Sequence, residues 1–169
     1  MPAPGAGMSA AVLLCEPKYA HNVGNALRAC ALLGAERLYW TGARVPPPEE
    51  WEPGTRLPRE ERMKCYAKTE LRHVDDDVRL DALEPAGAPV CVEIHEGAED
   101  LRDFVHPEDA LYVFGPEDGD VSKAVRLNCH RFVRIPTADP RERTPYNLAF
   151  CVGAVLLDRL TKQTRPWLA

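Results

Sequence analysis

Short apolar runs separated by polar turns recur along the sequence, and they constrain the fold more than any other feature. Each run has the length of a strand that is buried on both faces. We expect strands at 10–14, 37–40, 71–74, 89–94, 110–114 and 131–135. Segments with helical spacing lie between most of these runs. This alternation predicts an α/β fold with a mostly parallel sheet and flanking helices.

Two segments carry the clearest helical patterns. After Asn22, apolar residues recur at helical spacing as far as Gly34, a residue suited to the left-handed end of a helix. The segment 147–162 is apolar on nearly every side, so its helix must be buried within the domain or against a partner subunit. Shorter helices are expected at 59–67, 78–83, 100–104 and 122–127.

The composition is that of a soluble globular protein. Of the 169 residues, 45% are hydrophobic and 28% charged, which suits one domain spanning 1–169 with flexible ends at 1–9 and 163–169. The longest apolar run, 148–157, is too short to cross a bilayer. The first seven residues contain no Lys or Arg, which argues against a secretory signal and favours a cytoplasmic protein.

Several common site classes lack support in the sequence. The six cysteines include no CxxC pair, so we expect buried thiols in a reducing compartment and no metal site. The glycine-rich dinucleotide motif, the phosphate-binding loop of nucleotide hydrolases and the GxSxG nucleophile motif are all missing. A classical dinucleotide enzyme, a P-loop enzyme and a serine hydrolase are therefore disfavoured.

The net charge of −5 is unevenly distributed along the chain. Residues 73–121 contain fifteen acidic and two basic side chains, whereas residues 122–169 contain three acidic and nine basic ones. Counting alone favours ordinary solvated surface charge. The segregation nevertheless allows the folded domain to present a basic face to an RNA.

Three loops that follow predicted strands are the candidate ligand-binding segments. Ligands of parallel sheets bind beyond the carboxyl ends of the strands. The segment 22–28 offers Asn22 as a helix N-cap, Gly24 for close backbone approach and Arg28 as an isolated cation. The segment 115–122 forms a tight turn directly after a buried strand, and the segment 136–147 leads into the last helix.

Taken together, these loops resemble those of the SPOUT superfamily of RNA methyltransferases, specifically its SpoU/TrmH-like 2′-O-ribose class. The resemblance extends from about Ala11 to Leu160. Three collinear motifs carry it: Asn22, Gly24 and Arg28; then Gly115, Glu117, Gly119 and Ser122; then Ile135, Pro136 and Asn147.

The resemblance implies a C-terminal trefoil knot and a homodimer whose active site is shared across the interface. It also implies transfer of a methyl group from S-adenosyl-L-methionine to a ribose 2′-hydroxyl of tRNA or rRNA, leaving S-adenosyl-L-homocysteine. The implied partners are thus an RNA and a second copy of the chain, with no DNA and no membrane. No metal is needed, because the methyl donor is already activated.

Residue roles follow from the matched motifs. Catalysis is assigned to Arg28, Asn22, Glu117 and Asn147. Because arginine stays protonated at neutral pH, Arg28 is expected to act as a fixed cation oriented by Asn22 and Glu117. Cofactor binding is assigned to Phe114, Gly115, Pro116, Glu117, Gly119, Ile135, Pro136, Tyr146, Asn147 and Leu148. RNA binding is assigned to Arg44, Arg56, Arg59, Arg62 and Lys64.

The sequence departs from the family pattern at Pro145. The family usually has a serine two residues before the asparagine of the third motif, and this chain has Pro145 there. That departure, with the acidic net charge, motivates an alternative: a catalytically inactive SPOUT-like protein that binds RNA or cofactor. A third possibility is a flavodoxin-like domain for a small ligand, which shares the α/β alternation.

Overall fold

A single parallel sheet forms the centre of the protein. The structure is a computed structural model that describes residues 8–50, 65–85 and 87–164. Within these residues seven strands pair in the order β3-β2-β1-β6-β4-β7-β5, and every neighbouring pair is parallel. The strands are β1 (Ala10–Leu14), β2 (Arg37–Trp40), β3 (Glu70–His73), β4 (Ala88–Val92), β5 (Glu99–Asp100), β6 (Ala110–Phe114) and β7 (Arg131–Arg134). The predicted α/β class with a parallel sheet is confirmed.

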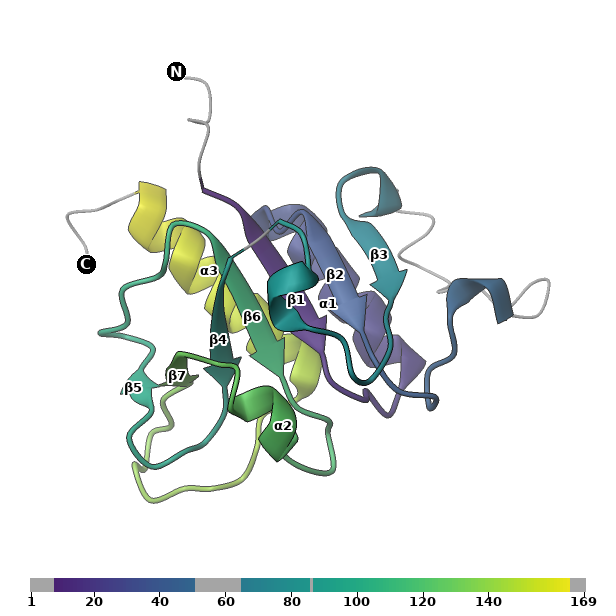
Figure 1. The fold of residues 1–169 in the computed structure, drawn as a ribbon. Helices are drawn as coiled ribbons and strands as arrows, with labels where there is room; N and C mark the ends of the chain where they lie inside the picture. Colours follow the sequence, from purple (N-terminus) through teal and green to yellow (C-terminus); the bar gives the residue numbers. More distant parts are fainter. Residues whose placement is uncertain (1–7, 51–64, 86, 165–169) are drawn as a thin grey trace.

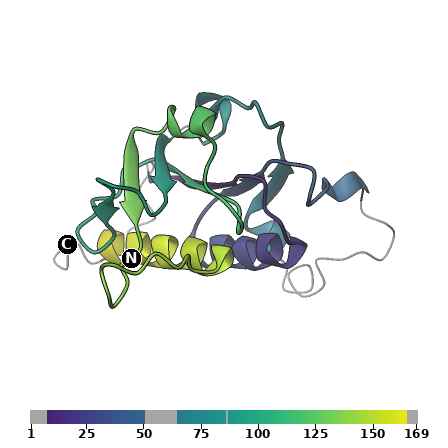
Figure 2. The same ribbon diagram turned by 90° about the horizontal axis from the view of Figure 1, so that it is seen from below.

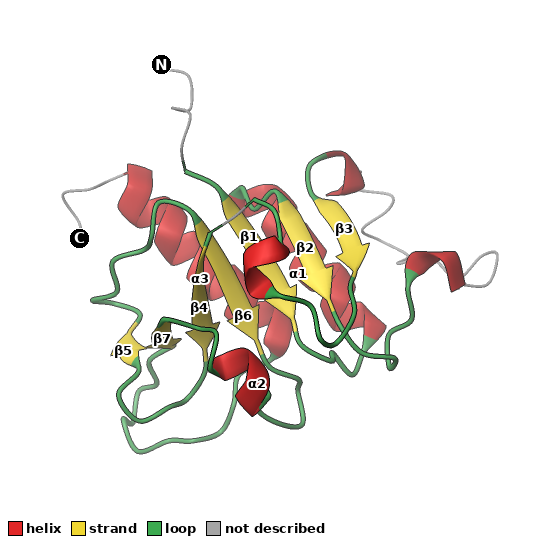
Figure 3. Ribbon diagram, in the orientation of Figure 1, coloured by secondary structure: helices red, strands yellow, loops and turns green. Residues whose placement is uncertain are grey.

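The two long helices cover one face of this sheet. They are α1 (Ala20–Leu33) and α3 (Leu148–Thr164), which lie in one layer behind the sheet in Figure 1 and along one side of it in Figure 2. The opposite face carries α2 (Lys123–Arg126) and a short 3₁₀ turn at Leu80–Ala82 (Figure 3). Further 3₁₀ turns occur at Pro48–Glu50 and Cys65–Ala67.

Strand β1 shows why the apolar runs are continuous. Its side chains alternate between the two faces of the sheet, as in any strand. Val12 and Leu14 belong to the hydrophobic core under α1 and α3, whereas Ala11 and Leu13 belong to a second core on the other face. All five residues of β1 are buried, so both faces require apolar side chains.

Helix α1 begins earlier than the sequence indicates. Its N-cap is Tyr19, so the prediction that Asn22 is the N-cap is wrong. Asn22 lies inside the first turn and is 2% exposed. Its side chain bonds to groups far along the chain instead of capping its own helix. The predicted end is confirmed, because Gly34 adopts a left-handed conformation with φ of 85°.

The helix expected at 100–104 is also wrong. The segment forms β5, which pairs with β7, and then a turn. The Leu101 amide continues this pairing by donating to the Arg134 carbonyl at 3.0 Å. The segment 122–127 does form a helix, α2, and the Ser122 hydroxyl caps it by accepting from the Val125 amide at 3.3 Å. Residues 59–64 of another expected helix lie outside the described residues.

Helix α3 is buried on one side and exposed on the other within the single chain. Val152, Val155 and Leu156 are fully buried, whereas Phe150 and Leu157 are each 54% exposed. The helix continues to Thr164, and the Asp109 carboxylate accepts from the amide and the hydroxyl of Ser9. Residues 1–7 and 165–169 lie outside the described residues. None of the described helices is both long enough and apolar enough to span a membrane.

Candidate functional site

A cavity of about 440 Å³ opens where the carboxyl ends of β4, β6 and β7 meet the start of α3. Its lining comes from four short segments: 92–94, 114–120, 135–137 and 143–148, together with Cys151. Three of these segments directly follow strands, and the fourth leads into α3. The cavity therefore occupies the position at which parallel sheets bind ligands.

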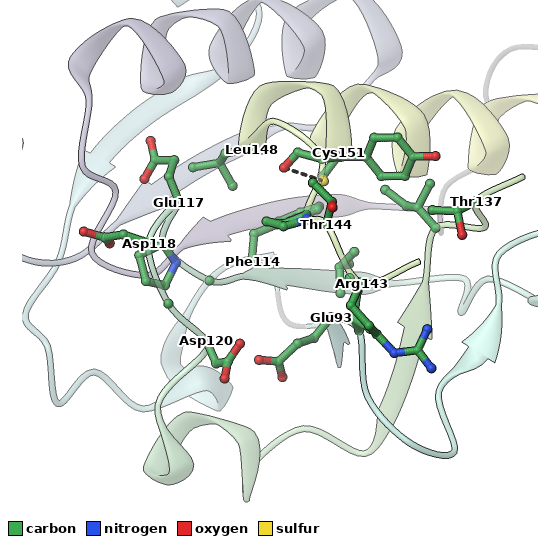
Figure 4. Close-up of a pocket in the computed structure, with 18 residues that line it drawn as sticks. Glu93, Phe114, Glu117, Asp118, Asp120, Thr137, Arg143, Thr144, Leu148 and Cys151 are labelled. Carbon is green, nitrogen blue, oxygen red and sulfur yellow. Dashed lines mark hydrogen bonds between the residues drawn. The ribbon is translucent and has the colours of Figure 1, made fainter. Parts of the chain in front are cut away.

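The cavity has an apolar side and a charged side. Phe114, Ile135 and Leu148 contribute apolar surface. Four carboxylates also line the cavity, from Glu93, Glu117, Asp118 and Asp120. Figure 4 shows Glu93 and Asp120 facing each other on one side, with Arg143 reaching in from the loop before α3. Such a site suits a ligand with a flat apolar part and a polar or cationic part.

The turn after β6 is shaped by Gly115. A Cβ atom on this residue would lie 2.9 Å from the Val121 backbone nitrogen, closer than side chains normally come. The loop thus closes on itself only with glycine here. From outside, Arg44 holds the loop by donating to both carboxylate oxygens of Asp118 at 2.9 Å. Lys18 adds a longer ion pair to Asp118 at 3.5 Å.

Three polar side chains from the three predicted loops meet beside the cavity. Asn22 Nδ2 donates to Glu117 Oε1 at 2.6 Å, and Asn147 Nδ2 donates to Asn22 Oδ1 at 3.1 Å. The Asn147 Oδ1 atom then accepts from the amides of Ala149 and Phe150, which caps α3. These bonds join α1, the turn after β6 and the start of α3 into one unit.

Glu117 is the charged member of this unit. Burial raises the pKa of its carboxyl, but hydrogen bonds from Asn22 and the Lys18 amide outweigh burial and hold the pKa below its ordinary value. Glu117 is therefore ionised at neutral pH. A carboxylate so held is suited to orient polar groups rather than to donate a proton.

The structure brings together most of the residues that the sequence assigned to the cofactor. Eight of the ten line the cavity; Pro136 and Asn147 do not, although each binds a residue that touches it. The Pro136 carbonyl accepts from the Tyr146 hydroxyl at 3.0 Å, and the Asn147 carbonyl accepts from the Cys151 amide at 3.0 Å.

Arg28 has a different environment from the one expected. It is half-buried on α1, does not line the cavity and forms no hydrogen bond or ion pair with another described residue. Asn22 and Glu117 bind each other and do not orient it within one chain. Of the expected RNA-binding residues, Arg44 donates a hydrogen bond to the Asp118 carboxylate. The other four, Arg56, Arg59, Arg62 and Lys64, lie outside the described residues.

Sequence reasoning missed the contribution of β4. Glu93 and Ile94 follow this strand and line the cavity. The rule that led to the other loops, that ligands bind beyond strand ends, did not find them, because the predicted strand at 89–94 contains both residues, whereas β4 ends at Val92. Arg143, Thr144 and Cys151 were also missed, since nothing in their spacing separates them from surface or core residues.

Burial makes the thiols of Cys151 and Cys15 poor nucleophiles. All six cysteines are free, and five of them are buried. Burial raises the pKa of the Cys151 thiol, which touches the cavity, to about 11, and that of Cys15 to about 12. Both are protonated at neutral pH. The described residues contain no group of His, Cys, Asp and Glu side chains placed to hold a metal ion.

Comparison with known protein families identifies the family to which the chain belongs. Residues 9–157 match the family model described as the SpoU rRNA Methylase family, which covers most of the chain. The chain belongs to the SpoU methylase family. No curated protein sequence matches it. The family assignment agrees with the three motifs whose side chains meet at the cavity.

Solved structures of SpoU methylases share the fold. The SpoU methyltransferase AviRb from Streptomyces viridochromogenes superposes with a TM-score of 0.76 at 22% identity, covering 98% of this chain and 64% of AviRb. An A. aeolicus TrmH/SpoU tRNA modifying enzyme gives 0.72 at 16% identity, covering 95% and 78%. A structure described by the 2-OH methylation of C/U34 on tRNA gives 0.73 at 22% identity, covering 93% and 97%. This chain thus spans less than two thirds of AviRb.

Proposed function

We propose that this SpoU-family protein is an S-adenosyl-L-methionine-dependent RNA methyltransferase that acts on a ribose 2′-hydroxyl of tRNA or rRNA. One observation carries the proposal: all three family motifs converge at one strand-end cavity, where Asn22, Glu117 and Asn147 form a continuous chain of hydrogen bonds. Among structural neighbours, AviRb has been solved in complex with AdoMet.

The cavity fits S-adenosyl-L-methionine in size and chemistry. Its volume of about 440 Å³ lies within the range of small-molecule sites. Phe114, Ile135 and Leu148 would contact the adenine ring, and the loop backbone after Gly115 offers hydrogen-bonding groups along one edge. Carboxylates suit the cationic part of the donor. When bound, the donor supplies an activated methyl group, so the protein needs only to position the acceptor and stabilise charge.

Arg28 would stabilise the negative charge that develops on the ribose oxygen as its proton leaves, and hold the adjacent phosphate. Its place on α1 supports a role across a dimer interface. Arg28 lies four residues before Leu32, which is 60% exposed, and therefore on the same stripe of the helix. We infer that Leu32 belongs to one apolar face with Phe150 and Leu157 of the adjacent helix α3, since all three side chains are large, apolar and exposed.

We infer that this face pairs two copies of the chain. Three large exposed apolar side chains on adjacent helices are unusual for a monomer surface. Pairing through them would bring Arg28 of one subunit toward the cavity of the other, which would account for its lack of partners among the described residues. Sedimentation of the purified chain measures this state directly, and a monomer at micromolar concentration would contradict it.

The remaining family properties are also proposals. A C-terminal trefoil knot is supported by the placement of β4 between β6 and β7 and by the packing of α3 beside α1. One continuous sheet supports a single domain. An RNA substrate supports the expected cytoplasmic location.

The decisive experiment is methyl transfer to unmodified RNA. Purified chain is incubated with methyl-labelled S-adenosyl-L-methionine and tRNA or rRNA, and the digest is analysed for 2′-O-methylnucleosides. We expect incorporation by wild type and a loss of about 100-fold or more in Arg28→Ala, with cofactor affinity nearly unchanged. Arg79→Ala, in which the lost arginine pairs only with Asp81 on the far face, should stay active.

Two other results have distinct meanings. Equal activity in Arg28→Ala and wild type would remove Arg28 from the reaction. Cofactor binding without incorporation into any RNA would favour the second candidate, an inactive binding protein. That candidate is favoured by Pro145, which lines the cavity at the position where the family usually has a serine hydroxyl.

A further inference from the structure

Glu93 is an ionisable group in the cavity that the assigned roles do not use. It follows β4, lines the cavity and has a side chain that is only 9% exposed. Its Oε1 atom accepts from the Val121 amide at 3.2 Å, on the far side of the turn that Gly115 closes. Its other oxygen, Oε2, is 3.7 Å from the Cys91 thiol, a weak donor.

Among the described residues, the Glu93 carboxylate forms one loose ion pair. Its partner, the Arg126 guanidinium, is 3.7 Å from Oε2, beyond the length of a direct charged hydrogen bond, and is itself about one third exposed. Asp120, which lines the same side of the cavity, adds negative charge (Figure 4). Burial raises the pKa of Glu93 above its ordinary value, and Arg126 only partly opposes this. Positive charge arriving in the cavity would therefore be favourable.

We propose that Glu93 is a specificity-determining residue that makes the cavity bind the cationic methyl donor more tightly than its neutral product. This inference rests on the proposed function, because it takes S-adenosyl-L-methionine as the ligand. The donor carries one more positive charge than S-adenosyl-L-homocysteine, at the sulfur atom. A buried carboxylate attracts that charge strongly, because few water molecules screen it.

The charge of the remaining lining supports this assignment. Arg143 is the one cationic side chain among the described residues that line the cavity, and it lies on the loop before α3. The other two lining carboxylates already have close partners. Asp118 accepts from the Arg44 guanidinium, and Glu117 accepts from the Asn22 side-chain amide. Glu93 has only a loose ion pair with Arg126 at 3.7 Å, so it and the neighbouring Asp120 can respond most to a cationic ligand. Discrimination of this kind would favour release of the product after each reaction.

The test is a calorimetric titration of wild type and Glu93→Gln with three ligands: the donor, its product S-adenosyl-L-homocysteine, and sinefungin. Sinefungin cannot transfer a methyl group but carries an ammonium in place of the sulfonium. Glutamine keeps an acceptor for the Val121 amide and removes only the charge. We expect affinity for the donor and for sinefungin to fall about tenfold, and affinity for the product to change less than about twofold.

Matched variants separate charge from structure. Glu96→Gln removes a carboxylate from the same loop, exposed and outside the cavity, and should leave all three affinities unchanged. Glu93→Asp keeps the charge and should recover part of the preference for the cationic ligands. Thermal denaturation of each variant establishes that it is folded. Should Glu93→Gln be unstable, Glu93→Asp, which draws the charge back from the cavity, should show a smaller loss of affinity for the two cationic ligands and none for the product.

The outcomes are distinguishable. Equal weakening of all three ligands in Glu93→Gln would make Glu93 a structural residue and overturn this proposal while leaving the proposed function intact. Unchanged affinities would also overturn it. If wild type binds neither donor nor product, the proposed function itself fails and this inference fails with it.

Discussion

The two ends of α3 are held in different ways, and the difference separates function from stability. At its start, Asn147 binds Asn22, and the neighbouring side chains surround an open cavity. Toward its end, Arg159 is 3% exposed and donates to the carbonyls of Ser9, Pro107 and Glu108. Polar groups at the far end bond to the surrounding protein and leave no cavity there, whereas those at the start bond to one another beside an open cavity.

Side chains around the C-terminal end of α3 form a network of hydrogen bonds and ion pairs. His106 Nδ1 lies 2.6 Å from the Tyr112 hydroxyl, and His106 Nε2 lies 2.8 Å from Asp158 Oδ2. Lys162 pairs with Asp158 at 2.8 Å and also donates to the carbonyls of Leu101 and Phe104. This network fixes the loop before β6 to α3. The comparison predicts that changes at the far end alter stability and changes at the start alter activity.

The largest expected effect is on stability, from Arg159→Ala. The substitution removes the Arg159 donor from the carbonyl oxygens of Pro107 and Glu108 and from the Tyr112 hydroxyl. We expect the free energy of unfolding to fall by about 3 kcal/mol, measured by urea denaturation. Arg141→Ala, which removes an exposed arginine paired with Asp139, should cost less than about 0.5 kcal/mol. Equal costs for the two variants would show that the network does not anchor α3.

The second-largest expected effect is a loss of methyl-transfer activity in Asn22→Ala. This change removes the link between Glu117 and Asn147 while leaving the far end of α3 intact. We expect methyl transfer to fall about 30-fold, with a loss of only about 1 kcal/mol in the free energy of unfolding. Asn25→Ala, on the exposed side of the same helix, is the matched control and should retain activity. A variant at Asn22 that loses stability but keeps its activity would place this residue with the far-end network.

The smallest effect is the pH dependence contributed by His106. Burial lowers the pKa of His106 from its ordinary value of 6.5, although its bond to Asp158 opposes this. The unfolded chain therefore binds the proton first as the pH falls. The contribution to stability is complete above about pH 6.5 and is lost below it, by at most about 1.4 kcal/mol per pH unit.

Urea denaturation between pH 7.5 and 5.5 measures this slope. His106→Gln should flatten it, whereas His21→Gln, at an exposed position on α1, should leave it unchanged. A slope that is identical in wild type and His106→Gln would mean that His106 does not titrate with unfolding.

Most of the sheet could be predicted from the sequence, because burial on both faces produces continuous apolar runs. The strands at 10–14, 37–40 and 110–114 have the predicted bounds. Local signals failed where long-range contacts decide the structure. Asn22 has a side chain that could cap a helix, but this side chain instead donates to Glu117, 95 residues further along the sequence. The segment 100–104 has helical spacing, but pairing with β7 makes it a strand and a turn.

The site was predictable in outline only. Glycine and asparagine motifs at strand ends identified the loops after β6 and β7. Glu93 was not identified, because an acidic residue after a strand looks like surface until its burial is known. The environment of Arg28 could not be inferred either, since its motif position does not show that it lies on α1 away from the cavity and without a partner among the described residues.

Hydrogen exchange with and without S-adenosyl-L-methionine, read by mass spectrometry, tests the central claim most directly. The claim is that the strand-end loops at the start of α3 form the ligand site and that its far end is structural. We predict that the donor protects peptides covering 92–94, 114–121 and 135–148 and leaves 104–109 unchanged. Protection confined to 104–109, or none in the three loop segments at saturating donor, would contradict the account.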